Sequence, residues 1–408
     1  MSSASASLSR ANLAVRIENS FQGLDSLRAA WDEAALRLGG TIYMSYDWCK
    51  AWWHFYGDHK ELRLFLFYAE ERIVGIVPIY VDCVGIKWLG LKVARLVGSN
   101  IPPKVFDPPI EEKWAGPIFR QVLTQLFECD FCDLLSFGPV SAQHKPAQIL
   151  EAVARGEARG FGRIYDVSGG VHSVFFLPGT YEEYLAALSR NERKKHKQDL
   201  AQLGKEYLVE MDVISDPVAV EIEFGRFALL HKMQWEGDGR LGHFGSWPKG
   251  EEFNQMLVKT QGKLGRVRFI RILAGGRVVS SIYGFAFGNH YFAELPARAV
   301  GPEWHRFSLG QAGLLAMIRA AIDEEMSLVE GGIAHYEHKL RLNAKEFSIR
   351  VVRVVSGRLA SFLRRQVYGF LQFCLLWGYY KLWYKRISPR LPAVFRKPIW
   401  SFWLRLDF

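Results

Sequence analysis

The segment 306–313 carries the clearest chemical signal in the sequence. It reads RFSLGQAG and precedes the apolar run LLAMIRAAIDEE, so it predicts a turn that leads into a helix. Ser308 can cap the first turn, while Gly310 and Gly313 leave room for a ligand near backbone N–H groups that have no intrahelical acceptor. Arg306 can add positive charge. The segment therefore predicts an anion-binding site, and the alternative is an ordinary capped helix packed on a sheet.

A cluster of titratable residues follows the predicted strand 327–332. It contains Glu330, His335, Glu337, His338 and Lys339. Ligands of α/β proteins commonly bind at the carboxyl edge of strands. We favour Glu330 or His335 as a general base and Lys339 as a contact for an anion or an acceptor. The alternative is a solvated charged loop.

Acyl transfer from a thioester to an amine or hydroxyl needs a held donor, a stabilised oxyanion and a base. The helix that begins near residue 309 would hold the donor. Strand 291–295 stops pairing before Pro296, and a bulged or splayed strand there would present free backbone N–H groups to an oxyanion. With the titratable cluster as the source of the base, the second half of the sequence contains candidates for all three requirements.

The elements that position these residues occur twice in the chain. Each copy has a β-hairpin, then a helix, then a short apolar strand that ends in glycine. The first copy comprises 62–81, 113–127 and 132–138, and the second comprises 267–287, 309–325 and 327–332. Because the order is the same in both, the pattern predicts two copies of one α/β unit.

The two predicted copies differ in the loop before the helix. The first copy has SNIPPKVFDPPIEEK there, and prolines supply no N–H donors for a phosphate. We therefore expect the first half to form a wall of the acceptor cleft and the second half to hold the donor. The predicted domains are a flexible leader at 1–25, a first half at 26–150, a second half at 151–355 and a tail at 356–408.

These motifs resemble the GNAT superfamily of acyltransferases. The pyrophosphate loop of that family reads Gln/Arg-x-x-Gly-x-Gly/Ala before a helix, and Gly310, Gln311 and Ala312 match its last three positions. Phe307 stands where the family has Gln or Arg, and Arg306 lies one residue early. The resemblance implies that acyl-CoA contacts the following residues: Arg306, Ser308, Leu309, Gly310, Gln311, Ala312 and Gly313.

Within the superfamily, the second half is similar to the FemAB/CelD-related branch found near polysaccharide and peptidoglycan biosynthesis. The segments that carry the similarity are 276–292, 307–318 and 329–342, the last of which reads VEGGIAHYEHKLRL. The resemblance covers about residues 30–355. It implies an α/β (α+β) fold with two tandem GNAT-like domains, whose sheets are mixed and mostly antiparallel, and it implies acyl or aminoacyl transfer.

Five further residues are candidate substrate contacts, namely Trp48, Trp52, Trp235, Arg193 and Lys194. The tryptophans lie in predicted helices and would offer stacking surfaces, although core packing is the alternative. The two cations belong to a basic run in a predicted helix at 181–203. That run would meet an anionic acceptor, CoA phosphate or tRNA, and a solvated face is the alternative.

The net charge of +10 comes almost entirely from the tail. Residues 356–408 contain ten Lys/Arg and one acidic residue, together with fourteen aromatic residues. The nearly neutral remainder makes a nucleic-acid groove across the body unlikely on bulk charge. The uncharged run 366–380 is too short to span a bilayer, which needs about 20 residues. We expect a basic aromatic helical tail that binds an anionic membrane surface; packing on the enzyme body is the alternative.

Cysteine content and the N-terminus favour a cytoplasmic protein, and the tail adds the expectation of a peripheral position at the inner membrane. Five cysteines are few and odd in number, as is typical of reducing compartments, and we expect no metal site. The N-terminal residues lack the apolar core of a signal peptide.

The leading hypothesis is a GNAT-type N-acyltransferase. It would transfer an acyl group, acetyl in the simplest case, from acyl-CoA to an amine or hydroxyl of a polysaccharide or cell-envelope precursor. One alternative is a FemAB-like transferase that uses aminoacyl-tRNA. A second is a non-catalytic scaffold held at the membrane by its tail.

Overall fold

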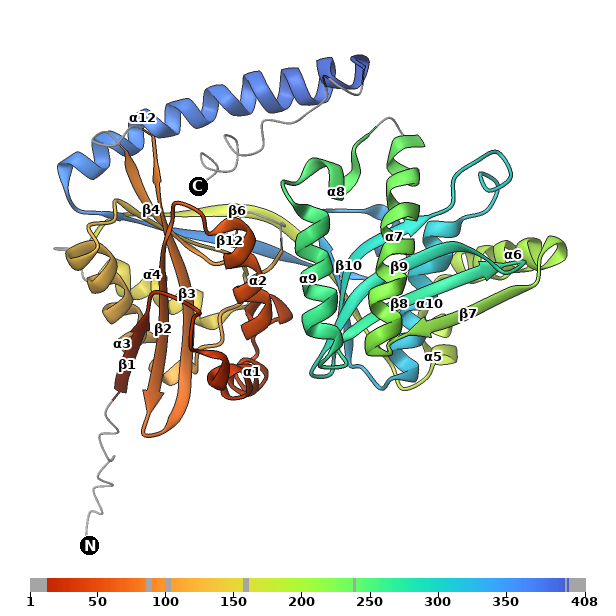
Figure 1. The fold of residues 1–408 in the computed structure, drawn as a ribbon, viewed down its shortest axis with the longest axis horizontal. Helices are drawn as coiled ribbons and strands as arrows, with labels where there is room; N and C mark the ends of the chain where they lie inside the picture. Colours follow the sequence, from red (N-terminus) through yellow and green to blue (C-terminus); the bar gives the residue numbers. More distant parts are fainter. Residues whose placement is uncertain are drawn as a thin grey trace, which may run out of the picture.

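A computed structural model describes residues 13–85, 90–99, 104–156, 161–237, 240–392 and 395. All its strands join in one twelve-stranded sheet, in the order β1-β2-β3-β4-β5-β12-β6-β11-β10-β9-β8-β7. In Figure 1 the N-terminal strands lie on the left and the C-terminal half on the right, with β6 and β12 running between them. The leader residues 1–12 and the tail residues 393–394 and 396–408 lie outside the described residues.

The first half of the chain builds six strands and four α-helices in the described residues. They are β1 (Leu13–Glu18), α1 (Arg28–Arg37), α2 (Tyr46–Tyr56), β2 (Glu61–Ala69), β3 (Arg72–Val84), β4 (Leu91–Leu96), α3 (Glu112–Thr124), β5 (Leu134–Ser141), α4 (Lys145–Gly156) and β6 (Phe161–Phe176). Short turns of other helix types are η1 (Asp25–Leu27), η2 (Ile42–Met44) and η3 (Gln125–Cys129).

The second half begins with two helices and ends with another six strands and their covering helices. They are α5 (Tyr181–Ala187), α6 (Arg190–Glu206), β7 (Val209–Ile214), α7 (Pro217–Gly237), α8 (Gly242–Ser246), α9 (Gly250–Gly262), β8 (Val267–Ala274), β9 (Arg277–Phe287), β10 (His290–Arg298), α10 (Leu309–Asp323), β11 (Leu328–Ile333), α11 (Glu337–Arg341) and β12 (Lys345–Ser356). The tail forms α12 (Leu359–Leu375), the π-helical η4 (Leu376–Ile387) and η5 (Ser388–Arg390).

The repeated hairpin, helix and strand are confirmed. Strands β2 and β3 form the first hairpin and β8 and β9 the second, each followed by a helix and a strand in the predicted order. The sheet is mixed and mostly antiparallel, because only the pairs β4–β5 and β10–β11 are parallel. Each parallel pair is only three residues long, so both copies contain the same short parallel contact.

The two halves share one sheet because their last strands are exchanged. Strand β6 lies beyond the predicted boundary at residue 150, but it follows β5 and α4 as β12 follows β11 and α11, so we count it with the first half. It pairs with β11 of the second half. Strand β12, which ends the second half, pairs with β5 of the first half and also with β6. The tandem arrangement therefore has one continuous mixed sheet, and strands from both halves make its centre.

Two predicted boundaries are corrected. Residues 13–18, expected in the flexible leader, form β1 because their alternating side chains pair antiparallel with β2. The predicted helix at 181–203 is two helices that break at Leu188. The Ser189 side chain accepts a hydrogen bond from the N–H of Glu192 at 3.2 Å and so starts α6 anew.

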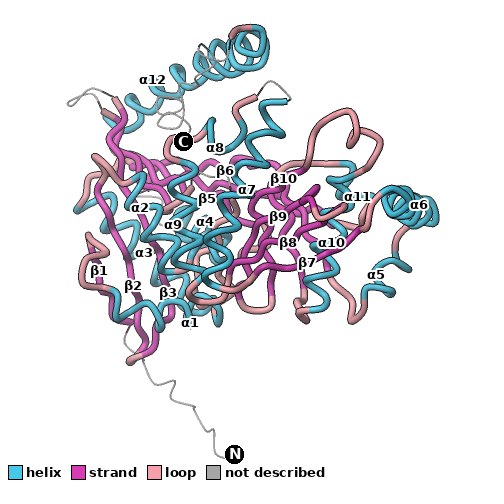
Figure 2. The backbone as a smooth tube through the Cα atoms, turned by 45° about the vertical axis from the view of Figure 1, so that its right-hand side comes forward, coloured by secondary structure: helices cyan, strands magenta, loops and turns pink. Residues whose placement is uncertain are grey.

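One apolar core spans both halves. The Trp48 ring of α2 packs against Phe106 of the first half and Phe253 of α9, and it is 0% exposed. Trp52 is 2% exposed and packs on Tyr80. Both tryptophans therefore lie in the core, as in the packing alternative, and not on an open stacking surface. Helix α9 lies beside α2 and α7 in Figure 2, which joins the halves on this face of the sheet.

Candidate active site between the two halves

The parallel pair β10–β11 separates after three residues. Pairing runs from His290 with Leu328 to Phe292 with Glu330 and then stops, and a bulge interrupts β10 between Ala293 and Leu295. From the bulge onward, β10 has no strand partner on the side of β11. The predicted irregularity in strand 291–295 is therefore present. Side chains contact several of the backbone groups that the separation releases: Lys104 Nζ lies 3.5 Å from the Glu294 carbonyl, His231 lies 2.9 Å from the Pro296 carbonyl, and the Arg298 N–H donates to Gln234 at 2.9 Å.

Helix α10 begins on one side of this opening. Ser308 is its N-cap residue, although its side chain makes no capping hydrogen bond with the described residues. A Cβ atom on Gly310 would meet only the Cδ atom of Arg298, at 3.9 Å, so space lies open there. A Cβ atom on Gly313 would lie 2.3 Å from the Ser280 hydroxyl. Gly310 thus borders open space, whereas Gly313 allows α10 to pack closely on β9.

Of the other residues predicted to contact the acyl donor, two pack in the core and two form polar contacts with α6. Leu309 is buried and Ala312 is partly buried, both packed in the core beneath α10. Arg306 pairs with Glu206 and lies over the Phe307 ring. Gln311 donates from Nε2 to a carboxylate oxygen of Glu192 at 3.0 Å, which ties α10 to the start of α6.

A buried ion pair lies at the bulge. Lys104, from the loop after β4, places its Nζ 2.9 Å from a carboxylate oxygen of Glu294, and both side chains are almost fully buried. The Tyr43 ring lies under the same ammonium group at 5.5 Å. Burial and the Glu294 carboxylate raise the pKa of the Tyr43 phenol well above its usual value, so the phenol stays protonated. Both halves of the chain thus meet at this point.

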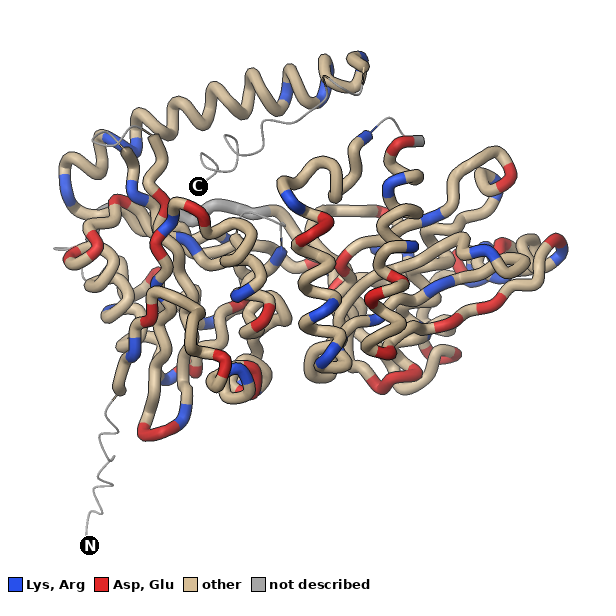
Figure 3. The backbone as a smooth tube through the Cα atoms, viewed as in Figure 1, with Lys and Arg blue, Asp and Glu red and all other residues tan. Residues whose placement is uncertain are grey.

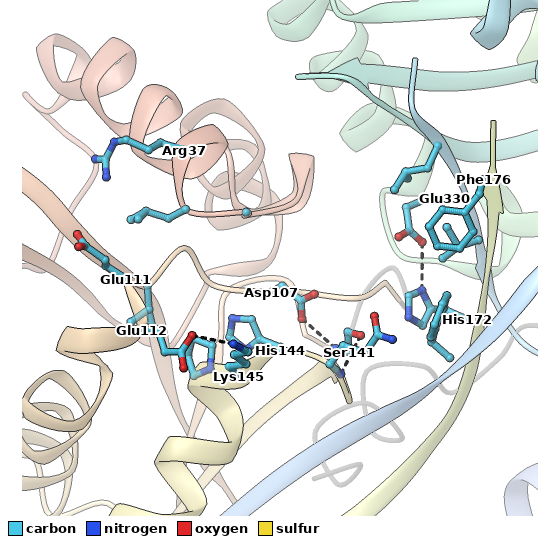
Figure 4. Close-up of a pocket in the computed structure, with 18 residues that line it drawn as sticks. Arg37, Asp107, Glu111, Glu112, Ser141, His144, Lys145, His172, Phe176 and Glu330 are labelled. Carbon is cyan, nitrogen blue, oxygen red and sulfur yellow. Dashed lines mark hydrogen bonds and ion pairs between the residues drawn. The ribbon is translucent and has the colours of Figure 1, made fainter. Parts of the chain in front are cut away.

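A histidine–glutamate pair lies beside the ion pair. Glu330, on β11, contacts Nδ1 of His172, on β6, at 3.1 Å. The two side chains line a cleft of about 550 Å³ whose other wall comes from the first half. Figure 4 shows Glu330 and His172 on one side of this cleft, with Asp107 and His144 on the other. A carboxylate next to an imidazole in a solvent-connected cleft can accept and pass on a proton.

The remaining predicted catalytic residues lie further out. His335 is 55% exposed and contacts the carboxylates of Glu346 and Glu337, which raise its pKa. Lys339 donates to the Gly331 carbonyl at 2.7 Å, directly after Glu330. Burial, and second the nearby Lys104 ammonium, lower the pKa of Lys339 to about 8. Lys339 therefore shares the electrostatic environment of the opening, while His335 belongs to the surface.

Trp235 lies on the face of the sheet that carries the buried ion pair. Its ring contacts His231 and His243, and His231 shares a hydrogen bond of 2.9 Å with the Pro296 carbonyl of β10. Burial, with His231 and Lys104 nearby, lowers the pKa of His243 to about 3, so its imidazole is neutral. The ring of Trp235 is thus part of an aromatic wall next to the bulged strand.

Arg193 and Lys194 lie on the outer face of α6, together with Arg190, Lys195 and Lys197. None of these five cations forms an ion pair within the described residues.

Sequence reasoning did not single out Lys104, Glu294, Tyr43 or His172. Glu294 left one usable signal, because it is a carboxylate inside the apolar strand YFAELP. No local sequence pattern marks Lys104 or His172. The pairing of β6 with β11 brings His172 to the site, and the contact of the first-half loop with β10 brings Lys104 there. Within the described residues, no group of three or more His, Cys, Asp or Glu side chains is arranged to hold a metal ion.

Comparison with known proteins agrees with this architecture. Residues 190–340 match the family model described as Acetyltransferase (GNAT) domain. The crystal structure of FemX superposes with a TM-score of 0.58 at 8% identity, covering 79% of this chain and 95% of FemX. A protein of unknown function from Bacteroides thetaiotaomicron gives a TM-score of 0.51 at 12% identity, covering 84% and 100%. No curated protein sequence matches the chain.

The fold is therefore that of the GNAT acyltransferases, in the FemAB-related arrangement. The second half carries the recognisable GNAT domain, and it contains the β10–β11 opening and α10. The identities of 8% and 12% define the fold alone.

We predict that Lys104→Met destabilises the protein by about 3–5 kcal/mol, because it leaves the Glu294 carboxylate buried without its partner. Adding Glu294→Gln to this variant should restore part of the loss. Urea denaturation of both single variants and the double variant measures the coupling. Strictly additive losses would show that the two side chains do not interact.

The pKa of Lys339 predicts a rise in stability in alkaline solution. The folded protein holds this pKa at about 8 against an ordinary 10.5, so between these values the unfolded chain binds more protons. The free energy of unfolding of the wild type, relative to Lys339→Met, should therefore rise as the pH increases from 8 to 10.5. Urea denaturation at several pH values tests this, and parallel pH profiles for the two proteins would contradict it.

Proposed function

We propose that this protein is an N-acyltransferase that moves an acyl group from acyl-CoA to an amine or hydroxyl of a polysaccharide or cell-envelope precursor. The observation that carries the proposal is the opening between β10 and β11. Tyr291 and Val329 face α10, whereas their neighbours Phe292 and Glu330 face Tyr43 and His172. A donor at α10 and an acceptor in the cleft would thus meet through the opening.

In the proposed reaction the donor's phosphates rest at the N-terminus of α10, near Gly310, where the open space admits them and the helix dipole favours negative charge. The acyl carbonyl reaches the bulge, and backbone N–H groups there stabilise the oxyanion. Glu330, supported by His172, takes the proton from the attacking amine or hydroxyl. The tetrahedral intermediate then expels the thiolate, and the acyl group stays on the acceptor.

The acceptor cleft is lined by apolar side chains together with polar side chains of both charges. Its first-half wall includes Arg37, Asp107, Glu111, His144 and Lys145. Asp107 accepts a hydrogen bond from the N–H of Ser141 at 2.9 Å, and His144 contacts the Pro108 carbonyl at 3.0 Å. Such a wall suits a hydroxyl-rich acceptor better than an apolar one. We place the reaction at the inner face of the membrane, where envelope precursors are built.

Aminoacyl transfer from charged tRNA is the second candidate, and α6 is the observation that favours it. Figure 3 shows Lys and Arg residues along this helix. The Gln311–Glu192 hydrogen bond attaches the start of α6 to the donor end of α10. An exposed row of cations there would suit a phosphate backbone.

A pair of variants separates the two donors. For acyl-CoA, Gly310→Asp should weaken acetyl-CoA binding at least ~10-fold by charge repulsion while the helix keeps its stability. Gly310→Ala, which adds no charge, serves as the control. Arg193→Gln with Lys194→Gln should leave acetyl-CoA binding unchanged but reduce a tRNA-dependent activity in a salt-dependent way. Calorimetry measures binding, and a wild type that binds neither acetyl-CoA nor longer acyl-CoAs would sink the acyl-CoA proposal.

The assignment of the base is tested by Glu330→Gln. We expect transfer to fall by about 10²–10⁴-fold with donor affinity unchanged, because the amide cannot take the proton. His335→Gln tests the competing base. Release of CoA from acetyl-CoA, with whichever amino sugar in a panel turns over, gives the rate. The assignment fails if His335→Gln abolishes turnover and Glu330→Gln does not.

A further inference from the structure

The helical tail is held to the body by one of its faces. Arg364 places Nη2 2.6 Å from Asp133, a fully buried carboxylate at the start of β5, and Ser361 donates to the same carboxylate. Tyr368 packs in a small apolar cluster with Val93 and Leu134. Ser361, Arg364 and Tyr368 recur three or four residues apart, so they define the body-facing side of α12. The position and rotation of the helix are therefore fixed.

The opposite face of the tail is apolar, and none of the described residues covers it. Its side chains also recur at helical spacing, and they are Leu359, Leu363, Val367, Phe370, Phe373 and Trp377. Phe370 and Trp377 are 66% and 59% exposed. Figure 1 shows α12 extending from the first half along the edge of the molecule, away from the sheet. A row of large apolar side chains fixed toward solvent marks a contact surface.

The charge around this row narrows the choice of partner. Residues 359–391 contain six Lys/Arg and no acidic residue. Lys381, Lys385 and Arg386 are exposed, and none of them forms an ion pair with a described residue. Figure 3 shows Lys and Arg toward the far end of the tail helix, beyond a long uncharged part. Trp377 lies between the apolar and the cationic parts. The indole ring of tryptophan is enriched at the boundary between hydrocarbon and water.

The tail suits the surface of a bilayer. No helix in the described part of the chain is long and apolar enough to cross a membrane. An amphipathic helix with aromatic and aliphatic side chains on one face and nearby cations lies in the plane of the interface.

We propose that α12 and η4 dock on an anionic membrane, with the row from Leu359 to Trp377 inserted among the lipids and Lys381, Lys385 and Arg386 against their phosphates. A second copy of this chain would cover the apolar row but would bring the same cations together. Anionic lipid satisfies both features. The inference does not depend on acyl transfer, since it rests on the tail alone.

Co-sedimentation of the full-length protein with vesicles tests the proposal. Wild type should bind vesicles of phosphatidylcholine with 30% phosphatidylglycerol, and bind pure phosphatidylcholine weakly. The variant Leu363→Ser/Phe370→Ser/Trp377→Ser should reduce binding at least ~10-fold. Its matched control, Ile222→Ser/Leu229→Ser/Met233→Ser, alters equally exposed residues of α7 and should bind as wild type does.

A second pair of variants separates charge from apolar contact. Lys381→Gln/Lys385→Gln should lower binding on the order of tenfold. Lys259→Gln/Lys263→Gln, at the C-terminal end of α9 and its C-cap, should leave it unchanged. The proposal is overturned if wild type ignores both vesicle types, or if the serine variant binds as well as wild type. It is also overturned if the serine variant converts a wild-type dimer to a monomer in light scattering, because a second copy then covers the row.

Discussion

The exchange of β6 and β12 is the constraint on which the rest of the molecule depends. Among the described strands, β6 pairs with β11 and β12 of the second half, and β5 of the first half has β12 as a neighbour. This pairing turns two similar units into one sheet. It also brings His172 next to Glu330, since these residues lie on the paired strands β6 and β11. Neither unit could assemble the cleft alone.

The same joining explains why a buried ion pair stands at the centre of the candidate site. Lys104 comes from the first half and Glu294 from the bulge in β10, so their contact fixes the first-half loop against the opening. Burial of such a pair adds little net stability, because desolvation offsets the attraction. The pair instead fixes the position of the two segments, because either charge would strongly destabilise the fold if it were buried without the other. The opening is thereby held between α10 and the first-half side of the cleft.

Local features of the fold could be predicted, and distant pairings could not. The two hairpins, the helix after Gly310 and the irregular strand near Glu294 each leave a signal within about 20 residues of sequence. Pairing of β5 with β12 joins residues about 200 positions apart, and no local pattern encodes it. His172 reaches the site through the pairing of β6 with β11, and Lys104 reaches it through the contact of the first-half loop with β10. Among the predicted contacts, Trp48 was ambiguous because a helical aromatic row suits a core and a stacking surface equally well.

Strand exchange also determines when the sheet can be completed during synthesis of the chain. A ribosome releases β5 and β6 long before β12, so the nascent first half carries an unpaired strand and an open sheet edge while about 200 further residues are made. At ordinary elongation rates this interval lasts on the order of 10–40 s. Exposed strand edges attract other chains, so the incomplete chain is at its most vulnerable to aggregation in that interval. The arrival of β12, almost at the end of synthesis, closes the sheet for both halves at once.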